Sequence, residues 1–450
     1  MTMHNHPPRT AAEEALSALL QTRLAADPVE GASGTRIGAL RRGARDAFAR
    51  LGLPHRRVEE WKYTDLRALL RTLPAPAGTP GGSVAAEAAT RAIDLSGARR
   101  ILFVDGVLSP DQSDLADLEP GLSVRPLRAA LADGRGSVEK FATLAPQRYD
   151  APLALNTAFL GEGLVIEVAE GATIARPLHV AHVVTAAQPA SLFARRLVDV
   201  GVKARVTLVE SFQGSDGSAY VMNDALELFV GDASHVDYVR VQEEGSAAFH
   251  LGTLMVDMGR DAVFHAFTLT TGAAVSRLSV YGRFSGTHSH GAIRGATLAR
   301  GKQHADISLL LDHAVAHCES RELFKTVLAD EARGVFQGKI VVQRDAQKTD
   351  GRMMSQALLL GDTAQMDNKP ELEIFADDVQ CGHGATTGAL DADLLFYLQA
   401  RGLPPQEAEA LLIQAFVGEA LQFIAHDGLR EGLIARAEHW LAKRVDFASA

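Results

Sequence analysis

The chain has 450 residues, which is long enough for two or three domains of ordinary size. Apolar residues make up 47% of it and charged residues 22%, as in most globular proteins with a large core. The formal net charge is −10, and this acidic balance argues against nucleic acid or an anionic membrane as the main partner, because binding to phosphates needs a basic surface.

The cysteine count and the N-terminal sequence predict the compartment. Two cysteines, Cys318 and Cys381, are too few for a disulfide framework and favour a reducing environment. The N-terminal MTMHNHPPRTAAEEAL lacks the charged-then-apolar pattern of a signal peptide. No apolar run approaches the roughly 18 residues of a membrane span. We therefore expect a cytoplasmic protein.

The N-terminal residues 1–95 are predicted to be a helical region with a linker. The segments 11–26 and 35–54 combine helix-forming residues with apolar residues at spacings of three and four. A third segment, RRVEEWKYTDLRALL, holds one of the two tryptophans. The stretch 72–90 is rich in proline, glycine and alanine and almost uncharged, which predicts a linker or a long surface loop.

Residues 96–388 have the sequence pattern of short β-strands. Runs such as GLVIEVAEGATI and PLHVAHVVT alternate apolar and polar residues between glycine turns. The turn glycines lie 30, 30, 28 and 27 residues apart, at Gly171, Gly201, Gly231, Gly259 and Gly286. A near-constant period made of strands without intervening helices indicates a mainly β fold of the solenoid type, whose coils bury their inner faces by stacking. A β-sandwich is the alternative, since it also contains many short strands.

Residues 389–450 are predicted to form a C-terminal helical domain. Asp391 can cap its first helix, and Gly402 can end that helix in the left-handed conformation. Pro404 and Pro405 open the next helix. The apolar residues of this helix are expected to lie along one stripe, made of Ala408, Leu412, Ala415, Phe416, Phe423 and Ile424. A last amphipathic stretch, REGLIARAEHWLAKRV, closes the chain.

Common catalytic motifs are missing from the sequence, which contains no GxxxxGK[ST] phosphate loop, no GxSxG elbow and no HExxH helix. The neighbouring acids Asp377 and Asp378 could suggest the paired carboxylates of glycoside chemistry. Successive side chains of a strand point to opposite faces, however, so the two cannot flank one bond. We expect one solvated acid and one acid that stabilises a turn.

Two short segments combine cysteine and histidine. In HAVAHCES, strand alternation would place His313 and His317 on one side and Cys318 on the other, too few ligands for a structural zinc site. In QCGHG, Cys381 and His383 are two residues apart and would face the same way in an extended segment. A thiolate and an imidazole suit zinc, copper or iron–sulfur species. Spacing alone leaves open whether either segment binds metal or only contributes buried side chains.

The stretch AQMDNKPELEIFADDVQCGHGATTGALDADLLFYLQARGL (364–403) closely resembles the hallmark of the SufB/SufD family of iron–sulfur cluster assembly proteins. HAVAHCESRELFK and ARGVFQGKIVVQRDAQKTDGRMMSQALLL resemble further segments of the family pattern. EEWKYTDL and the HGATTG ending look more like SufD than SufB, and the resemblance spans about residues 59 to 424. It departs at QCGHG, where lysine and serine are common around the cysteine, and at RMMSQALLL, which lacks the usual asparagines.

The resemblance implies a right-handed parallel β-helix flanked by N- and C-terminal α-helical regions. It also implies two partners, a SufB-like paralogue and a SufC-like ABC ATPase, which would supply the nucleotide site that this sequence lacks. The C-terminal helices of the family dock the ATPase, so Phe396, Tyr397 and Phe416 are candidate docking residues. The alternative is that these aromatic side chains belong to the core.

The family has a functional histidine and a neighbouring cysteine near the interface of the two paralogues, and these match His383 and Cys381. An incomplete ligand set shared between two chains would let a scaffold bind a transient iron–sulfur cluster and release it. We expect His383 to be the more important of the two, because an imidazole can bind metal or donate a proton near neutral pH. Both should lie at the edge of the solenoid.

The leading hypothesis is therefore a non-enzymatic scaffold subunit of a SufBCD-type complex. One alternative is a β-helix polysaccharide lyase or hydrolase. Another is a purely structural subunit, in which Cys381 and His383 can both be replaced without loss of cluster assembly. Family members have also been linked to reduced flavin, although the sequence contains no flavin motif. Without the paralogue, a homodimer formed through edge strands is a further candidate assembly.

Overall fold

A computed structural model describes residues 8–26, 36–95, 97–185 and 188–448 of the chain. The helices are α1 (Ala11–Ala26), α2 (Arg36–Leu51), α3 (Leu66–Leu69), α4 (Gly82–Arg91), α5 (Leu127–Asp133), α6 (Ala151–Ala158), α7 (Ala392–Ala400), α8 (Pro405–Leu421) and α9 (Asp427–Ala448), with short 3₁₀ turns η2 (Glu59–Trp61), η3 (Pro110–Gln112) and η4 (Gly136–Lys140). The strands are β1 (Arg99–Val104), β2 (Val107–Leu108), β3 (Leu122–Pro126), β4 (Glu162–Val168), β5 (Leu178–Val184), β6 (Ala190–Val200), β7 (Arg205–Gly214), β8 (Tyr220–Val230), β9 (His235–Glu243), β10 (Phe249–Met258), β11 (Val263–Thr270), β12 (Val275–Phe284), β13 (His290–Ala299), β14 (His304–His313), β15 (Glu319–Leu328), β16 (Arg333–Val342), β17 (Asp350–Leu359), β18 (Gln365–Ile374) and β19 (Gln380–Gly388).

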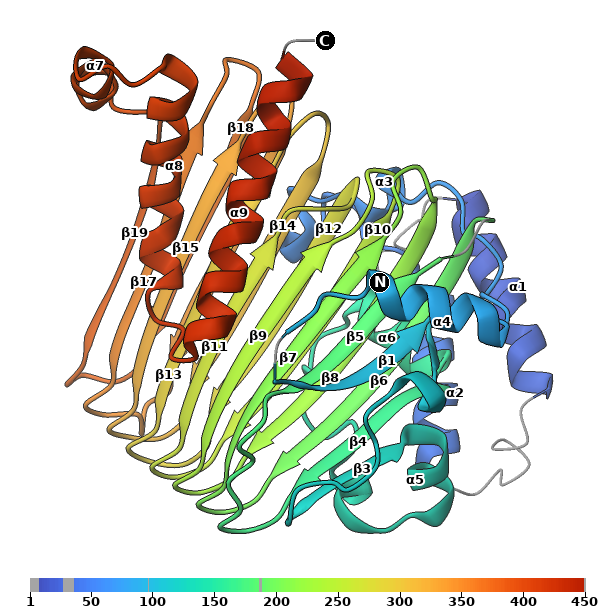
Figure 1. Cartoon of the computed structure of the whole chain (residues 1–450). Coiled ribbons are helices and arrows are strands. Elements are labelled where there is room, and N and C mark those ends of the chain that lie inside the picture. The colour runs from blue at the N-terminus through green and yellow to red at the C-terminus, as the bar shows by residue number, and fades with distance from the viewer. Residues whose placement is uncertain (1–7, 27–35, 96, 186–187, 449–450) are drawn as a thin grey trace.

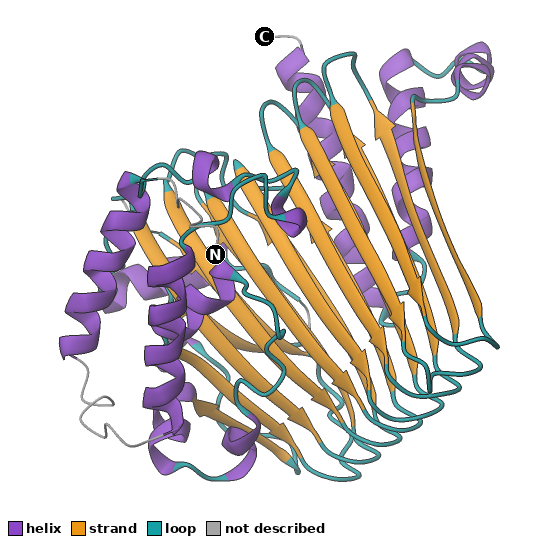
Figure 2. Cartoon of the chain, turned by 180° about the vertical axis from the view of Figure 1, so that it is seen from behind, coloured by secondary structure: helices purple, strands orange, loops and turns teal. Residues whose placement is uncertain are grey.

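The strands from β4 onward form a parallel β-solenoid. Each coil contributes one strand to each of two sheets that lie against each other (Figure 1 and Figure 2). The β19 sheet has the order β19-β17-β15-β13-β11-β9-β7-β5-β1-β2, and the β18 sheet has the order β18-β16-β14-β12-β10-β8-β6-β4-β3. Across the described residues the solenoid makes about eight turns. The prediction of a mainly β solenoid between terminal helices is confirmed, and the sandwich alternative is wrong.

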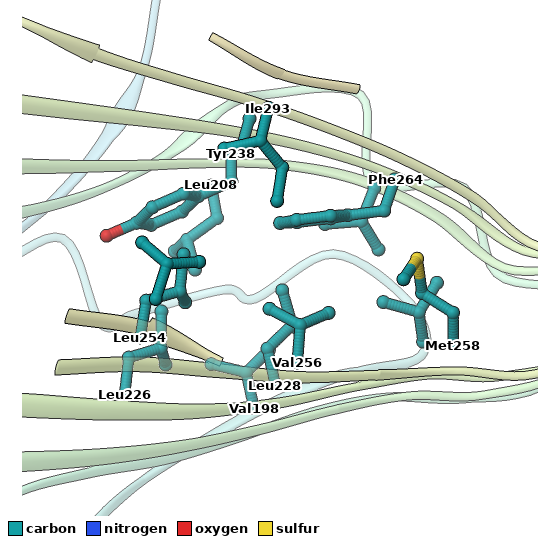
Figure 3. Packing of buried hydrophobic residues seen from close by; sticks show 14 of the residues in the cluster. Val198, Leu208, Leu226, Leu228, Tyr238, Leu254, Val256, Met258, Phe264 and Ile293 are labelled. Atoms are coloured by element: carbon teal, nitrogen blue, oxygen red, sulfur yellow. The ribbon is translucent and has the colours of Figure 1, made fainter. Parts of the chain in front are cut away.

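The core of the solenoid is an apolar column between the two sheets. Alternate residues of each strand point inward, so Leu226 and Val256 of the β18 sheet face Tyr238 and Phe264 of the β19 sheet (Figure 3). All four of these side chains are almost completely buried. Burying one large apolar side chain stabilises the fold by about 1.5–3 kcal/mol, and every coil adds several of them to the column.

The periodic glycines lie at the turns where successive coils stack. Gly171 has a φ of +70°, but Gly201, Gly231, Gly259 and Gly286 have ordinary φ values. At these four positions a Cβ would collide with the coil before. On Gly231 it would lie 2.6 Å from the Val200 carbonyl oxygen, and on Gly286 it would lie 1.9 Å from the Arg260 nitrogen. The regular spacing of these glycines in the sequence therefore reflects close backbone contacts between successive coils, which only glycine permits.

Helices cover the outer faces of both sheets. The helices α1, α2 and α6, together with Trp61, pack against Phe193, Val221 and Leu251 of the β18 sheet. The helices α8 and α9 lie across the β19 sheet, where Val239 and Phe267 form part of one apolar cluster with them (Figure 1). Within the described residues, no helix is long and apolar enough to cross a membrane.

The predicted linker at 72–90 is wrong in its second half, because α4 begins at Gly82. Ala85 and Ala88 of this helix pack against Leu102 and Ala181 of the β19 sheet. Alanine is the strongest helix former, and its small side chain lets the helix lie close to the strands. The region 96–388 likewise contains helices between β3 and β4, before the regular coils begin.

The helix α7 begins and ends where the sequence predicts, and α8 begins at Pro405 as expected. The Asp391 side chain accepts hydrogen bonds from two backbone N–H groups at the start of α7, and Gly402 follows that helix with a φ of +94°. The predicted stripe of α8 is only partly right. Ala408 and Ile424 are buried, but the other buried residues of this segment are Ile413, Val417, Ala420 and Leu421. Apolar residues lie on both sides of α8, so their spacing did not decide which side faces the sheet.

Candidate functional site

The two ends of the solenoid differ. At one end β2 pairs antiparallel with β1, and β3 pairs antiparallel with β4, so the parallel sheets are closed by short strands. At the other end β18 and β19 are the last strands of their sheets in the described part of the chain, and most of their residues are partly or fully exposed. A strand edge of this kind presents N–H and C=O groups to which another chain can bind. We call β18 and β19 the open end.

Cys381 lies on β19 and points into the solenoid. It pairs with Gly351 of β17, and a Cβ on that glycine would lie 3.7 Å from the Cys381 Sγ and 3.4 Å from the Ser320 Oγ. The thiol is half-buried against the apolar column. Burial raises the pKa of Cys381, and the nearby Asp350 and Glu322 act in the same direction. The neutral thiol is therefore favoured until a metal ion displaces its proton.

His383 lies on the same face of β19, two residues further on. It pairs with Met353, whose side chain is buried in the apolar column, whereas the His383 ring is exposed. Residues two apart in a strand have Cα atoms about 6.5 Å apart, so one iron–sulfur cluster could contact both side chains. The structure thus brings these two predicted site residues together at the open end.

A buried carboxyl group lies beneath this pair. Glu322 of β15 occupies the same column as Met353 and His383, two coils deep. It is 3% exposed, and neither carboxyl oxygen has a close hydrogen-bond partner among the described residues. Burial raises the pKa of Glu322 to about 8. Glu322 is not among the site residues expected from the sequence, because its place below His383 depends on the register between coils.

The pair lines a cleft of about 790 Å³ that extends from β19 to the end of α8. Glu322 contributes to its wall, and Phe423 lies on the α8 side. Arg321 and Arg352 bring positive charge to the same cleft, and both donate hydrogen bonds to Asp350, at 2.6 and 3.2 Å. The cleft can therefore admit an anionic group beside a thiol and an imidazole.

The HAVAHCES segment is arranged differently from the prediction. His313 and Cys318 are both buried inside the solenoid, whereas His317 is exposed in a turn at a φ of +61°. The chain turns between β14 and β15, so strand alternation does not apply across the segment. The His313 ring stacks on Phe284, and burial lowers the pKa of His313 to about 4. The described residues do not bring these three side chains together as a metal site.

The acidic pair behaves as predicted. Asp377 and Asp378 lie in the exposed loop between β18 and β19. Asp378 forms an ion pair with Lys348, and its carbonyl accepts a hydrogen bond from the Lys348 backbone N–H. These contacts stabilise a turn and leave no arrangement for paired-carboxylate catalysis.

The three aromatic candidates for ATPase docking fall into two groups. Phe396 and Tyr397 lie on α7 and are 72% and 53% exposed. Among the described residues of α7 none is buried, and this apolar helix stands away from the sheets (Figure 1). Phe416 of α8 is half-buried, with the Lys325 ammonium 4.5 Å from its ring centroid. Of these three candidates, Phe396 and Tyr397 are exposed enough to contact a partner directly.

These features define a class of protein, a parallel β-solenoid with one closed end and one open end, where the last strand carries a thiol and an imidazole. Sequence comparison gives the family. Residues 182–416 match the family described as SUF system FeS cluster assembly, SufBD core domain, and residues 13–180 match the SufBD protein N-terminal region. The chain belongs to the SufBD family of iron–sulfur cluster assembly proteins, and the resemblance seen in the sequence is confirmed.

Individual relatives cover most of the chain. An iron–sulfur cluster assembly SufBD family protein of Synechocystis is 31% identical over 87% of this chain and 89% of its own length. The iron–sulfur cluster assembly protein SufD of Escherichia coli is 30% identical over 86% of this chain and 89% of its own length. The protein of the same name from Bacillus subtilis is 25% identical over 77% of this chain.

Proposed function

We propose that this chain is a scaffold subunit on which an iron–sulfur cluster is assembled at the open end, with a SufB-like paralogue completing the site. The observation that carries the proposal is the placement of Cys381 and His383 on one face of the edge strand β19. Two protein ligands are too few to retain a cluster permanently. A second chain that supplies the other ligands would make binding dependent on assembly, which suits a cluster that must later be released.

The same end of the solenoid offers a surface for the paralogue. The exposed apolar side chains Met354, Ile374 and Phe375 lie on or beside its last strands, at 37%, 41% and 60% exposure. Apolar side chains beside an unpaired strand edge are typical of a surface that another chain covers. A related solenoid presenting a similar edge is the partner that fits this shape.

We further infer that α7 contributes to the binding of a SufC-like ABC ATPase. Leu394, Phe396 and Tyr397 expose an apolar surface next to the C-terminal helices. The sequence contains no phosphate-binding loop, so the ATPase would bring the nucleotide site, and the chain itself would act without catalysis. No feature of the described site supports the binding of reduced flavin. A cytoplasmic location stays a prediction that the two free thiols favour.

The test is to co-express the chain with its paralogue and the ATPase, add iron and sulfide without oxygen, and follow cluster absorbance. His383→Ala should reduce cluster formation at least about tenfold while the complex still purifies intact, and Cys381→Ala should reduce it less. The matched control is His290→Ala, which removes another exposed imidazole of the β19 sheet.

Two results would decide against the proposal. Normal cluster formation in the double variant His383→Ala/Cys381→Ala would favour the purely structural subunit. A complex that fails to form in His383→Ala would show that the imidazole acts in subunit binding rather than in cluster binding.

A further inference from the structure

Three side chains of residue types that bind metal ions converge on the outer face of the β19 sheet, away from the open end. His235 and Asp237 lie two residues apart on β9, and His265 lies directly opposite Asp237 on β11. Their neighbours Val236 and Phe264 point into the apolar column, so these three side chains point outward. They are half-buried, with 22%, 27% and 39% of the side chains of His235, Asp237 and His265 exposed.

The distances between the ligand atoms fit a metal ion. The Asp237 Oδ1 lies 3.2 Å from the His235 Nε2 and 3.2 Å from the His265 Nδ1. Two ligands at about 2.0–2.1 Å from a tetrahedral ion are about 3.3–3.4 Å apart, so both pairs already have nearly the required separation. All three ligand atoms lie within 4.8 Å of one another, and the imidazole rings are nearly perpendicular at 87°. The two imidazole rings therefore meet edge to face beside one carboxylate, with their centroids 5.2 Å apart.

The site also has room for further ligands. A cavity of about 30 Å³ adjoins Asp237 and His265 beneath the connection between α8 and α9. A buried water needs about 10–15 Å³ by this measure, so the cavity can hold one or two. His426 and Arg294 line the same cavity. The charge of Arg294 opposes a bound cation, but its guanidinium carbon lies 3.3 Å from the Phe423 ring centroid, so stacking on that ring holds the group.

We propose that His235, Asp237 and His265 form a binding site for a divalent first-row transition metal ion of the zinc and ferrous iron class, with water in the open positions. Two imidazoles and one carboxylate are a ligand set for these ions, whereas magnesium and calcium prefer oxygen ligands alone. The site is independent of Cys381 and His383 and goes beyond the proposed function. The ion would join the neighbouring strands β9 and β11 beneath the connection between α8 and α9.

The test uses the full-length chain after treatment with a chelator and desalting. Zinc binding is measured by titration calorimetry, and cobalt binding is measured by visible absorption, which reports the coordination geometry. The wild type should bind one equivalent with micromolar affinity or better. Asp237→Ala and His265→Ala should each weaken this binding about a hundredfold or more, since even the loss of a supporting residue commonly costs 10–100-fold.

A matched control separates this site from adventitious binding to surface histidines. His288 and His317 are exposed at neighbouring turns, and their rings stack at 4.8 Å, so they offer a simple two-imidazole site. His317→Ala should leave the tight equivalent unchanged. The proposal is overturned if the tight equivalent persists in Asp237→Ala and His265→Ala, if it disappears in His317→Ala, or if the wild type binds no metal at micromolar concentration.

A folding control covers the case in which alanine disturbs the sheet. His265→Gln keeps a polar side chain beside Asp237 but removes the imidazole, and it should lose binding as His265→Ala does. Zinc should raise the thermal unfolding temperature of the wild type and of His317→Ala, because an ion that binds only the folded chain stabilises it. A rise of the same size in a correctly folded His265→Gln would contradict the assignment.

Discussion

Near the open end, Glu322 is a carboxyl residue whose buried surroundings disfavour its charged form. A carboxyl group buried without a strong partner stays protonated, because ionisation in an apolar setting is costly. Ser320 and Arg321 lower the pKa of Glu322, but burial outweighs them and raises it to about 8. Glu322 is therefore a neutral acid below Cys381 and His383 at neutral pH, and it becomes an anion under mildly alkaline conditions.

This shift predicts a pH dependence of folding stability. Glu322 has a pKa of 4.5 as a model group and about 8 in the folded chain, so between these values the folded state binds more protons than the unfolded state. The stability that the neutral form provides is complete below pH 4.5 and is lost as the pH rises through 8. Glu322→Gln should remove this loss, so the stability of this variant relative to the wild type should rise by several kcal/mol between pH 5 and pH 9.

The measurement is the thermal or urea midpoint of the isolated chain between pH 5 and pH 9. Glu319→Gln serves as the control, because it changes a carboxylate of the same strand that is 49% exposed. It should follow the wild type. Wild-type and Glu322→Gln curves that run parallel over the whole range would contradict the raised pKa.

At the residue scale, the sequence could predict that Cys381 and His383 point the same way, because this depends only on strand alternation over two residues. It could not predict Glu322 or the contact between Asp237 and His265. Those relations depend on the register between coils, and the period varies between 27 and 30 residues. A shift of one residue in register moves a side chain to the opposite face of the sheet.

At the scale of the element, the stacked turns depend on glycine. A Cβ on Gly286 would lie 1.9 Å from the Arg260 backbone nitrogen, and a backbone atom cannot rotate away as a side chain can. Gly286→Ala should therefore force the two coils apart and destabilise the chain by about 1–3 kcal/mol. Gly388→Ala, on β19, meets no atom within 4 Å and should leave the urea midpoint nearly unchanged. Equal midpoints for the two variants would show that the turns adapt without cost.

The segment EEWKYTDL attaches the N-terminal helices to the solenoid. Trp61 is 2% exposed, and the Arg277 guanidinium carbon lies 3.9 Å from its ring centroid. The Glu60 carbonyl accepts hydrogen bonds from Arg277 at 2.8 Å and from Gln337 at 3.0 Å. Glu59 forms an ion pair with Lys369 of β18, so this segment reaches the open end.

Replacement of Trp61 should release the N-terminal region. Trp61→Ala removes the aromatic side chain between helices and sheet, and such changes cost about 3–5 kcal/mol. Limited proteolysis should then cut within residues 36–70 while the solenoid fragment survives. Lys62→Ala changes an exposed neighbour and should be cut at the wild-type rate. Loss of the whole fold in Trp61→Ala would show instead that the solenoid depends on its N-terminal cover.

The sequence predicted the type of each helix or strand better than it predicted which elements pack against each other. The caps at Asp391 and Gly402 follow from local hydrogen bonding and backbone freedom, so the sequence contains what decides them. The 72–90 segment was misjudged because proline and glycine at its start concealed an alanine-rich helix. That helix is stabilised by Leu102 and Ala181, which are distant in the sequence.

At the scale of the whole molecule, the two ends of the solenoid are not equivalent. Its first coils are closed by antiparallel strands and helices, whereas its last coils end in two unpaired strands. A parallel solenoid without a cap tends to add another edge, because unpaired backbone groups and apolar side chains remain at its end. When the proposed paralogue is absent, a second copy of this chain would present an edge of the same kind.

We therefore expect the isolated chain to dimerise reversibly through β18 and β19 at micromolar concentration. A positive charge on the exposed Thr386 would face its copy across a two-fold interface, so Thr386→Lys should weaken the dimer about tenfold or more. Ser123→Lys makes the same change on β3 at the closed end and should leave the dissociation constant unchanged. Sedimentation velocity over a concentration series measures both constants.

Added SufB-like paralogue should replace the second copy and convert the dimer into a mixed pair. A wild type that remains monomeric at high concentration, or a dimer that is weakened only by Ser123→Lys, would place the interface elsewhere.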